Sequence, residues 1–425
     1  MKKWLYNNNF IYTAFSLSIA SSIFATEASI IKDESEKLCS QILSSATNIT
    51  ATPLMERHED DACVVFSFDG GGSRGILSAH IAHAIETKLG RPIADLADIV
   101  VGTSTGSIIA SLLSTKRKNT NAALHTAEEV CGIYKKELGR IFSRSWLHTI
   151  RSLWGYWGPK YTGSELRDIL YRAFREHDHG YDYLLTDRVV KQEKTKAGET
   201  RECHVQLLTT AYQISDSHHY GSKGKNAFIF DSEKARNCSS HNFHTSTMLS
   251  GTTAQPVFFP AAKVKSLGGH EVELFDPGAL VNPSLIGLHA ARKFVKKRMY
   301  PNATCNDNDY AQIDKKIVII SVGSGEVEPQ FDFYQAVYGG ALHMIIPEIH
   351  ILLGAQKAST DWIIRKLCPN VTYLRLQIPL SSDIDGGDQV DPQTLMALKG
   401  KADEIIAGSA FQSTIDKLKS IKKIA

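Results

Sequence analysis

The sequence lacks an excess of charge of either sign. It contains 48 lysines and arginines against 45 aspartates and glutamates in 425 residues, a formal net charge of +3. Such a balance gives no strong basic field, so binding of nucleic acid through bulk charge is a poor explanation of function. The seven cysteines show no CxxC spacing, which argues against a zinc ribbon. Because their number is odd, at least one thiol stays unpaired within the chain.

The sequence also lacks internal repeats of fixed period and any Pro-rich or Gly/Ser-rich linker. Hydrophobic residues make up 43% and charged residues 22%, which excludes a disordered or collagen-like chain. The length alone allows two or three domains of about 100–200 residues each. Without a linker, we expect one elaborated domain at residues 61–425, preceded by an N-terminal extension at residues 26–60.

The first 25 residues differ from the rest of the chain. A lysine pair precedes an uncharged apolar stretch at residues 10–24, and Ala25 and Ala28 offer small residues for cleavage. This stretch is shorter than the roughly 20 residues that a helix needs to span a bilayer. We therefore expect a cleaved signal peptide at residues 1–25 and an exported protein, secreted or periplasmic, rather than a membrane anchor. Export would expose the cysteines to an oxidising compartment, where some are expected to pair.

Two segments follow the order strand, glycine turn, helix. Residues 63–68 (CVVFSF) suit a buried strand and run straight into residues 69–75 (DGGGSRG), after which apolar residues recur at helical spacing. Residues 99–101 and 102–106 (GTSTG) repeat the order. Two such units within about 50 residues are typical of a parallel sheet covered by helices. Further apolar runs predict strands at residues 205–211, 227–230 and 317–322, and an edge strand at 371–376.

Three polar segments are predicted to lie at the surface. The charged residues 186–202 indicate a surface excursion, and residues 213–226 indicate a hairpin loop. Residues 398–424 have helical spacing and many lysines, which predicts a solvated terminal helix.

The GxSxG segment at residues 102–106 places Ser104 between a predicted strand and its helix. A serine on such a sharp turn points out of the sheet, and its small neighbours let the backbone bend. The following helix directs its N-terminal dipole at developing negative charge. Small residues also cluster by chance, so a packed Gly/Ser turn is the structural alternative. The strand and helix on either side favour a nucleophile.

The glycine turn at residues 69–75 brings several backbone N–H groups to the start of a helix, which is an anion-binding arrangement. It suits an oxyanion hole, a nucleotide pyrophosphate or simply a tight turn. No second nucleotide-binding half follows, which disfavours a dinucleotide. A P-loop is excluded, because Gly-Lys-Ser/Thr is absent from the turn.

A third segment, residues 274–283 (LFDPGALVNP), carries an acid before a turn, which alone is ordinary turn chemistry. Taken in order with the two glycine segments and with further matching segments, it makes the chain resemble the patatin-like phospholipase family from about residue 64 to about residue 410. The further segments are residues 159–163 (PKYTG), 210–212 (TAY), 252–260 (TTAQPVFFP) and 321–325 (SVGSG). We expect an exported bacterial member. In one departure, the family's Asp-Gly-Gly/Ala motif reads Asp276-Pro277-Gly278, and the proline removes a backbone donor.

This resemblance implies a three-layer α/β/α sandwich with a mainly parallel central sheet. It also implies a Ser–Asp dyad, in which Ser104 attacks the acyl carbonyl and Asp276 acts as general base. The oxyanion would be stabilised by backbone N–H groups of the turn, with Arg74 holding the turn or attracting phosphate; the donor residues are Gly70, Gly71 and Gly72.

The implied function is that of a phospholipase A-type acyl hydrolase, with no metal and no other cofactor. Its partner would be a phospholipid or another acyl lipid at a membrane surface, bound peripherally, and a protein activator stays open. Two alternatives remain. The same dyad suits a lysophospholipase, a neutral-lipid esterase or an acyltransferase. Pro277 also leaves room for a catalytically weak lipid-binding protein.

Other candidate chemistry is less specific. His270 lies close to Asp276 in the sequence, and His80 and His83 follow the glycine turn, so a Ser-His triad stays a rival. Solvated or capping histidines are the plainer interpretation. Four aspartates resemble a calcium loop, but two glycines spoil the spacing and no glutamate closes it, so an acidic turn is expected at Asp383, Asp385, Asp388 and Asp391.

Two apolar segments are consistent with a lipid substrate. Residues 140–161 interleave aromatic residues with arginines and hold three of the five tryptophans, a pattern that suits a membrane interface. Residues 341–353 (ALHMIIPEIHILL) are very apolar but are interrupted by Pro347 and Glu348, so they are not expected to span a bilayer. Ordinary core, or a helix that covers the site, is the alternative for both segments.

Overall fold

The computed structural model describes residues 57–58, 61–143, 158–176, 180–195, 198–214, 227–278, 281–301, 304–327, 341–381, 384 and 387–422. They all belong to one compact unit, Leu54–Ala425. The predicted signal peptide lies outside them. So does the predicted extension at residues 26–60, apart from the short strand β1 (Arg57–His58). In the described part, no helix has the length and apolar character needed to cross a membrane.

An eight-stranded sheet runs through this unit in the order β10-β11-β8-β3-β2-β12-β14, with β9 paired to β8. Its members are β2 (Cys63–Phe68), β3 (Ile99–Thr103), β8 (Gln206–Gln213), β9 (Ala227–Asp231), β10 (Ala262–Lys265), β11 (Glu271–Phe275), β12 (Ile317–Val322) and β14 (Thr372–Leu376). The five strands from β8 to β14 pair in parallel, whereas β9, β10 and β11 pair antiparallel. The predicted strands, including the edge strand β14, are therefore confirmed.

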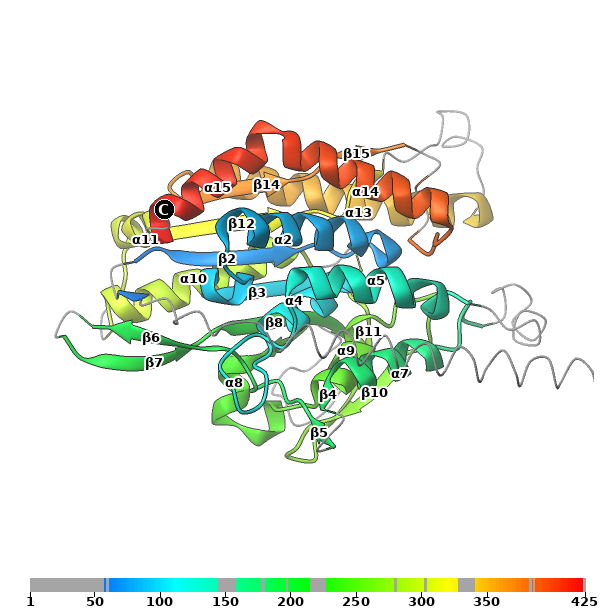
Figure 1. Cartoon of the computed structure of the whole chain (residues 1–425), viewed down its shortest axis with the longest axis horizontal. Helices are drawn as coiled ribbons and strands as arrows, with labels where there is room; N and C mark the ends of the chain where they lie inside the picture. The colour runs from blue at the N-terminus through cyan, green and yellow to red at the C-terminus, as the bar shows by residue number, and fades with distance from the viewer. Residues whose placement is uncertain are drawn as a thin grey trace, which may run out of the picture. The chain divides into compact units, whose positions relative to one another are not determined.

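Both faces of the sheet are covered, and the central strands β2, β3 and β12 are buried at every position. In β2, Val64 and Phe66 belong to one buried cluster and Cys63 and Val65 to another, on the opposite face. The first face packs against α2 (Gly75–Leu89), α4 (Thr105–Ser114), α5 (Ala127–Ile141), α14 (Pro392–Ala407) and α15 (Ser409–Lys422). The second packs against α10 (Pro283–Met299), α11 (Asp307–Lys315) and the end of α13 (Ala341–Leu367). The predicted α/β/α sandwich is confirmed (Figure 1).

Smaller elements surround this frame. Three minor sheets contain β1 with β6 (Val190–Lys194) and β7 (Thr200–His204), β4 (Arg175–Glu176) with β5 (Tyr181–Asp182), and β13 (Glu326–Val327) with β15 (Pro379–Leu380). The remaining helices are η1 (Gly72–Arg74), α3 (Ile93–Leu96), α7 (Ser164–Ala173), α8 (Ser232–Asn237), η3 (Ser239–His241) and α9 (Thr245–Thr252). In Figure 1 the hairpin β6–β7 projects beyond the sheet at the left.

The surface excursion predicted at residues 186–202 is wrong in one respect, because this segment folds into β6 and most of β7. Three of its charged residues are buried, namely Arg188, Lys191 and Glu193. Lys191 donates to the Asp95 and Ala97 carbonyls, and Glu193 pairs with Arg298 at 2.5 Å. Local charge predicted solvation, but partners from distant segments satisfy these groups inside the protein.

The solvated terminal helix predicted at residues 398–424 is also wrong. Two helices, α14 and α15, occupy this region, and each buries an apolar face that includes Leu398 and Leu418. The lysines occupy the outer faces, so composition alone masked the amphipathic pattern. The apolar residues 341–353 form the start of α13, which runs through Pro347 to Leu367.

The expected export suggested that some cysteines pair. Five of those that the structure describes carry free thiols, namely Cys131, Cys203, Cys238, Cys305 and Cys368. Two of these five, Cys131 and Cys368, are buried in the core, where a thiol packs as a small apolar group.

Candidate active site

Ser104 occupies the sharp turn between β3 and α4. Its backbone has φ 54° and ψ −127°, a left-handed conformation that is unusual for a residue with a side chain. The flanking glycines make this turn possible. A Cβ on Gly102 would lie 2.2 Å from the Gly106 carbonyl oxygen, and a Cβ on Gly106 would lie 2.2 Å from the Phe68 carbonyl oxygen. The GxSxG spacing therefore has a steric origin, and the strain is concentrated at the serine.

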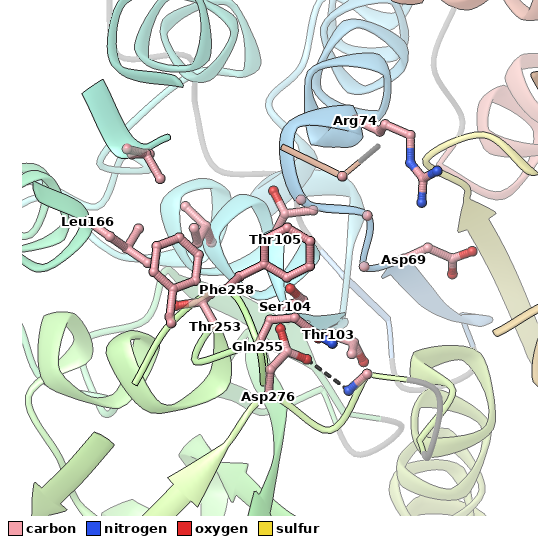
Figure 2. A pocket seen from close by; sticks show the side chains of 18 of the residues that line it. Asp69, Arg74, Thr103, Ser104, Thr105, Leu166, Thr253, Gln255, Phe258 and Asp276 are labelled. Carbon is pink, nitrogen blue, oxygen red and sulfur yellow. Dashed lines mark hydrogen bonds between the residues drawn. The ribbon is translucent and has the colours of Figure 1, made fainter. Parts of the chain in front are cut away.

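Asp276 follows β11 and brings a buried carboxylate to the same place. Its side chain is 4% exposed, and its Oδ1 accepts the Gly278 N–H at 2.8 Å. Figure 2 shows the carboxylate directed toward Ser104. Burial raises the pKa of Asp276 to about 6, although hydrogen bonding from Ser104 and from the Gly278 N–H lowers it.

Ser104 and Asp276 are not joined by a hydrogen bond of ordinary geometry. The Ser104 hydroxyl lies near enough to influence the carboxylate, but Oδ2 of Asp276 has no hydrogen bond of ordinary geometry. Long or poorly aligned contacts are usual in active sites without substrate. One carboxylate oxygen is thus fixed by the loop, and the other faces the serine.

Pro277 does not disturb this arrangement. The donor to Asp276 is the N–H of Gly278, two residues after the acid, so the missing N–H of proline is not used. Gly278 itself has φ 49°. The Asp276 N–H in turn donates to the Ala254 carbonyl at 3.1 Å, which fixes the start of the loop.

The glycine turn lies directly beside Ser104. A Cβ on Gly70 would approach the Ser104 Cβ to 3.1 Å. The N–H groups of Gly70, Gly71 and Gly72 have no acceptor within the described part of the chain. Three unused donors next to a nucleophile are the arrangement that an oxyanion hole requires.

Two residues that the sequence did not single out brace this turn. The Ser324 hydroxyl, which follows β12, donates to the Gly70 carbonyl at 2.7 Å. In a trans peptide the C=O and the next N–H point in opposite directions, so this bond directs the Gly71 N–H away from Ser324. Farther along the chain, the Gly387 carbonyl accepts the Ser73 N–H at 2.7 Å.

The charged residues of the turn have separate surroundings. Asp69 is buried and pairs with Arg375 at 2.6 Å, while its N–H donates to the Val322 carbonyl. Arg74 lines the cavity described below, and Figure 2 shows it on the side of the turn away from Asp276. Asp69 therefore anchors the turn in the sheet, whereas Arg74 faces the space in front of it.

A cavity of about 990 Å³ opens in front of these residues. Ser104, Asp276, the glycine turn and Arg74 all line it. Most of its wall is apolar and comes from three helices and the segment after α9: Ile108, Leu112, Ile133, Leu138, Ile141, Leu166, Ile169, Leu170, Phe258 and Phe259. Such a wall suits a hydrocarbon chain held beside a polar reaction centre.

The rival chemistries find no support in the described residues. No described histidine lines the cavity. His80 lies against Cys131 at 3.8 Å, and burial lowers its pKa to about 4. The backbone N–H of His270 donates to Ser266.

The acidic turn does not form a calcium loop. Asp388 accepts hydrogen bonds from Lys160 and, at 2.6 Å, from Tyr161, and Asp391 caps α14. Asp383 and Asp385 lie outside the described residues. No group of three or more potential metal ligands occurs in the part that the structure describes. The tryptophans of the aromatic segment, Trp146, Trp154 and Trp157, also lie outside it.

Comparison with known proteins places these features in a family context. The family model described as patatin-like phospholipase matches residues 66–286. Patatin-like protein 3 of Arabidopsis thaliana is 27% identical over 289 residues, and the match covers 63% of this chain and 59% of that protein. Patatin-like protein 2 of the same plant is 23% identical over 394 residues, covering 86% of this chain and 88% of that protein.

The chain is also similar to solved structures. Human GIVD cytosolic phospholipase A2 matches with a TM-score of 0.42 and 10% identity, covering 86% of this chain and 61% of that one. The two sequence relatives are plant proteins, so the bacterial origin stays a prediction.

Proposed function

The chain belongs to the patatin-like phospholipase family, and on that basis we propose that it is a lipid acyl hydrolase that cleaves fatty-acyl esters of phospholipids through Ser104 and Asp276. The observation that carries this proposal is the meeting of three groups at one cavity. A serine at positive φ, a buried carboxylate directed at it and a glycine turn with unused N–H donors line the same space.

In the proposed reaction, Ser104 Oγ attacks the ester carbonyl as its proton moves to Oδ2 of Asp276. The N–H groups of Gly70, Gly71 and Gly72 stabilise the oxyanion of the tetrahedral intermediate. When the intermediate collapses, the protonated Asp276 returns the proton to the leaving alcohol. Water then attacks the acyl-serine by the same proton route. A pKa of about 6 suits this role, because the group is mostly ionised at neutral pH yet basic enough to accept a proton.

The shape of the cavity supports a long-chain acyl ester. The apolar wall formed by α4, α5 and α7 would hold the fatty chain, while the ester lies at Ser104. We further propose that the enzyme acts at a membrane surface as a peripheral protein. Export after cleavage of residues 1–25 belongs to the same proposal and rests on the sequence pattern.

Two rivals stay open within this proposal. A lysophospholipase, a neutral-lipid esterase or an acyltransferase would use the same dyad with a different lipid or acceptor. A weak lipid-binding protein is disfavoured by the contacts at Pro277, because the Asp276 loop keeps its N–H donor.

The decisive experiment compares the purified protein with Ser104→Ala. The wild type should release fatty acid from phosphatidylcholine micelles and should be labelled by a fluorophosphonate probe. Ser104→Ala should lose both properties while its circular dichroism spectrum and melting temperature stay native, because the turn tolerates a smaller side chain. Persistent labelling or hydrolysis by Ser104→Ala would contradict the assignment.

A further inference from the structure

One wall of the cavity is built from residues that follow the segment matched by the family model. These residues belong to β13, α13 and the loop before α14: Glu326, Val327, Gly354, Gln356, Lys357 and Gly387. Unlike the apolar wall, this wall carries polar side chains. It borders the glycine turn, since Gly387 contacts Gly72.

Lys357 is the notable cation of this wall. No carboxylate oxygen lies within 4.0 Å of its ammonium group among the described residues. Its one polar contact is a long one, 3.5 Å to the Gly325 carbonyl. Three other charged residues that line the cavity do have an oppositely charged partner: Asp69 pairs with Arg375, Glu137 with Arg140 and Lys160 with Asp388.

Gln356, the neighbouring residue on α13, also has unused hydrogen-bonding capacity. Its side-chain nitrogen Nε2 is buried and has no acceptor in the described part of the chain. A buried donor without an acceptor is costly, and a cation that has left water without a counter-ion is costlier. Burial lowers the pKa of Lys357, and the nearby Arg74 and Arg375 lower it further, while Asp69 and Glu326 oppose them.

We infer that Lys357 and Gln356 form a subsite for the phosphate of the lipid head group. A phosphodiester oxygen would accept from the Lys357 ammonium and from the Gln356 amide, and its negative charge would supply the missing counter-ion. The acyl chain and the head group would then occupy opposite walls, with the ester between them at Ser104. This inference rests on the proposed function, because it assumes that a lipid ester occupies the cavity.

The kinetic test compares two lipids with the same acyl chains, phosphatidylcholine and diacylglycerol, in mixed micelles. Lys357→Met keeps the aliphatic stem and removes the charge, so kcat/KM for phosphatidylcholine should fall by about 10- to 100-fold, the worth of one hydrogen bond to a charged group. Turnover of diacylglycerol should change less than about threefold, because this lipid has no phosphate for Lys357 to bind. Lys357→Arg should retain most of the phosphatidylcholine activity. The exposed Lys366→Met, on the same helix, is the matched control and should behave as wild type.

Equal losses on both lipids, or full phosphatidylcholine activity in Lys357→Met, would overturn the inference. Hydrolysis of diacylglycerol but not of phosphatidylcholine by the wild type would overturn it as well, yet would leave an acyl hydrolase at Ser104. If neither lipid is hydrolysed, the proposed function fails on its own terms.

A binding measurement tests the subsite without turnover. In the Ser104→Ala background, calorimetry with monomeric dodecylphosphocholine should show binding that Lys357→Met weakens by at least about tenfold. Dodecylmaltoside, which has no phosphate, should bind both variants equally. Inorganic phosphate should compete with dodecylphosphocholine if the phosphate alone is recognised. Unchanged dodecylphosphocholine binding by Lys357→Met contradicts the subsite.

Discussion

Replacing Asp276 by asparagine is expected to abolish turnover and, at the same time, to stabilise the fold. The carboxylate is buried, and its pKa is raised from 3.8 to about 6, mainly by that burial. Each pH unit between the two values corresponds to about 1.4 kcal/mol. The ionised group therefore costs the folded protein up to about 3 kcal/mol at neutral pH relative to the unfolded chain.

The sign of the pH dependence follows from proton binding. Between about pH 4 and pH 6 the folded protein keeps a proton on Asp276 that the unfolded chain has already released. The free energy of unfolding of the wild type therefore falls as the pH rises through this window. Asparagine has no proton to release, and its Oδ1 can still accept the Gly278 N–H. The stability advantage of Asp276→Asn should be small below about pH 4 and should reach its full size above about pH 7.

Urea unfolding of both proteins at a series of pH values measures this difference directly. Asp416→Asn on α15 is the matched control, because it makes the same substitution at an exposed carboxylate. In the same samples, kcat should fall by at least about 100-fold for Asp276→Asn. If Asp276→Asn is less stable than wild type at pH 8, or if the difference in the free energy of unfolding does not change with pH, burial does not destabilise the ionised carboxylate and the reasoning is refuted.

Three other predictions concern the same site. For wild type, kcat/KM on a soluble ester should rise with pH through about 6 and then level off, as Asp276 ionises. Replacing His80, His83 or His270 by glutamine should leave this pH profile unchanged. An inactive histidine variant would favour a triad. Pro277→Gly should leave kcat equal or raise it, since the Gly278 donor is retained; a large loss would show that proline itself shapes the loop. Ser324→Ala should lower kcat about fivefold or more with KM unchanged, because a bond worth about 1 kcal/mol no longer orients the Gly70 peptide, whereas Ser324→Thr should be nearly normal. Equal losses in both Ser324 variants would point to packing instead.

Local sequence predicted the parts of the site that are made of contiguous residues. The elbow around Ser104 and the glycine turn each lie between a strand and a helix, and their chemistry can be read within seven residues. The role of Asp276 could be predicted only from the order of several segments along the chain, because an acid before Pro-Gly is common in turns. The structure brings these residues to one cavity, and the parallel pairing of β2 with β3 explains why the two glycine segments meet.

The residues that the sequence did not single out for the site act from outside these motifs. Ser324, Lys357 and Gly387 reach the turn only because β12 pairs with β2 and because α13 and the loop before α14 pack beside it. Ser324 lies in one of the segments that match the family, but that segment does not indicate its contact with Gly70, and nothing in the immediate neighbours of Lys357 and Gly387 marks these two residues. The buried charges of β6 were missed for the same reason, since Lys191 and Glu193 find partners far away in the chain.

The brace between Ser324 and Gly70 also has a consequence in time. The two residues are 254 positions apart. A ribosome that adds about 5–20 residues per second needs roughly 10–50 seconds to synthesise the chain between them. The base, Asp276, precedes Ser324 by only 324 − 276 = 48 residues, so the nucleophile and its base are both present without the Ser324 hydroxyl for roughly the last 2–10 seconds of that interval. Until Ser324 has been made, the growing chain lacks the group that orients the Gly70 peptide.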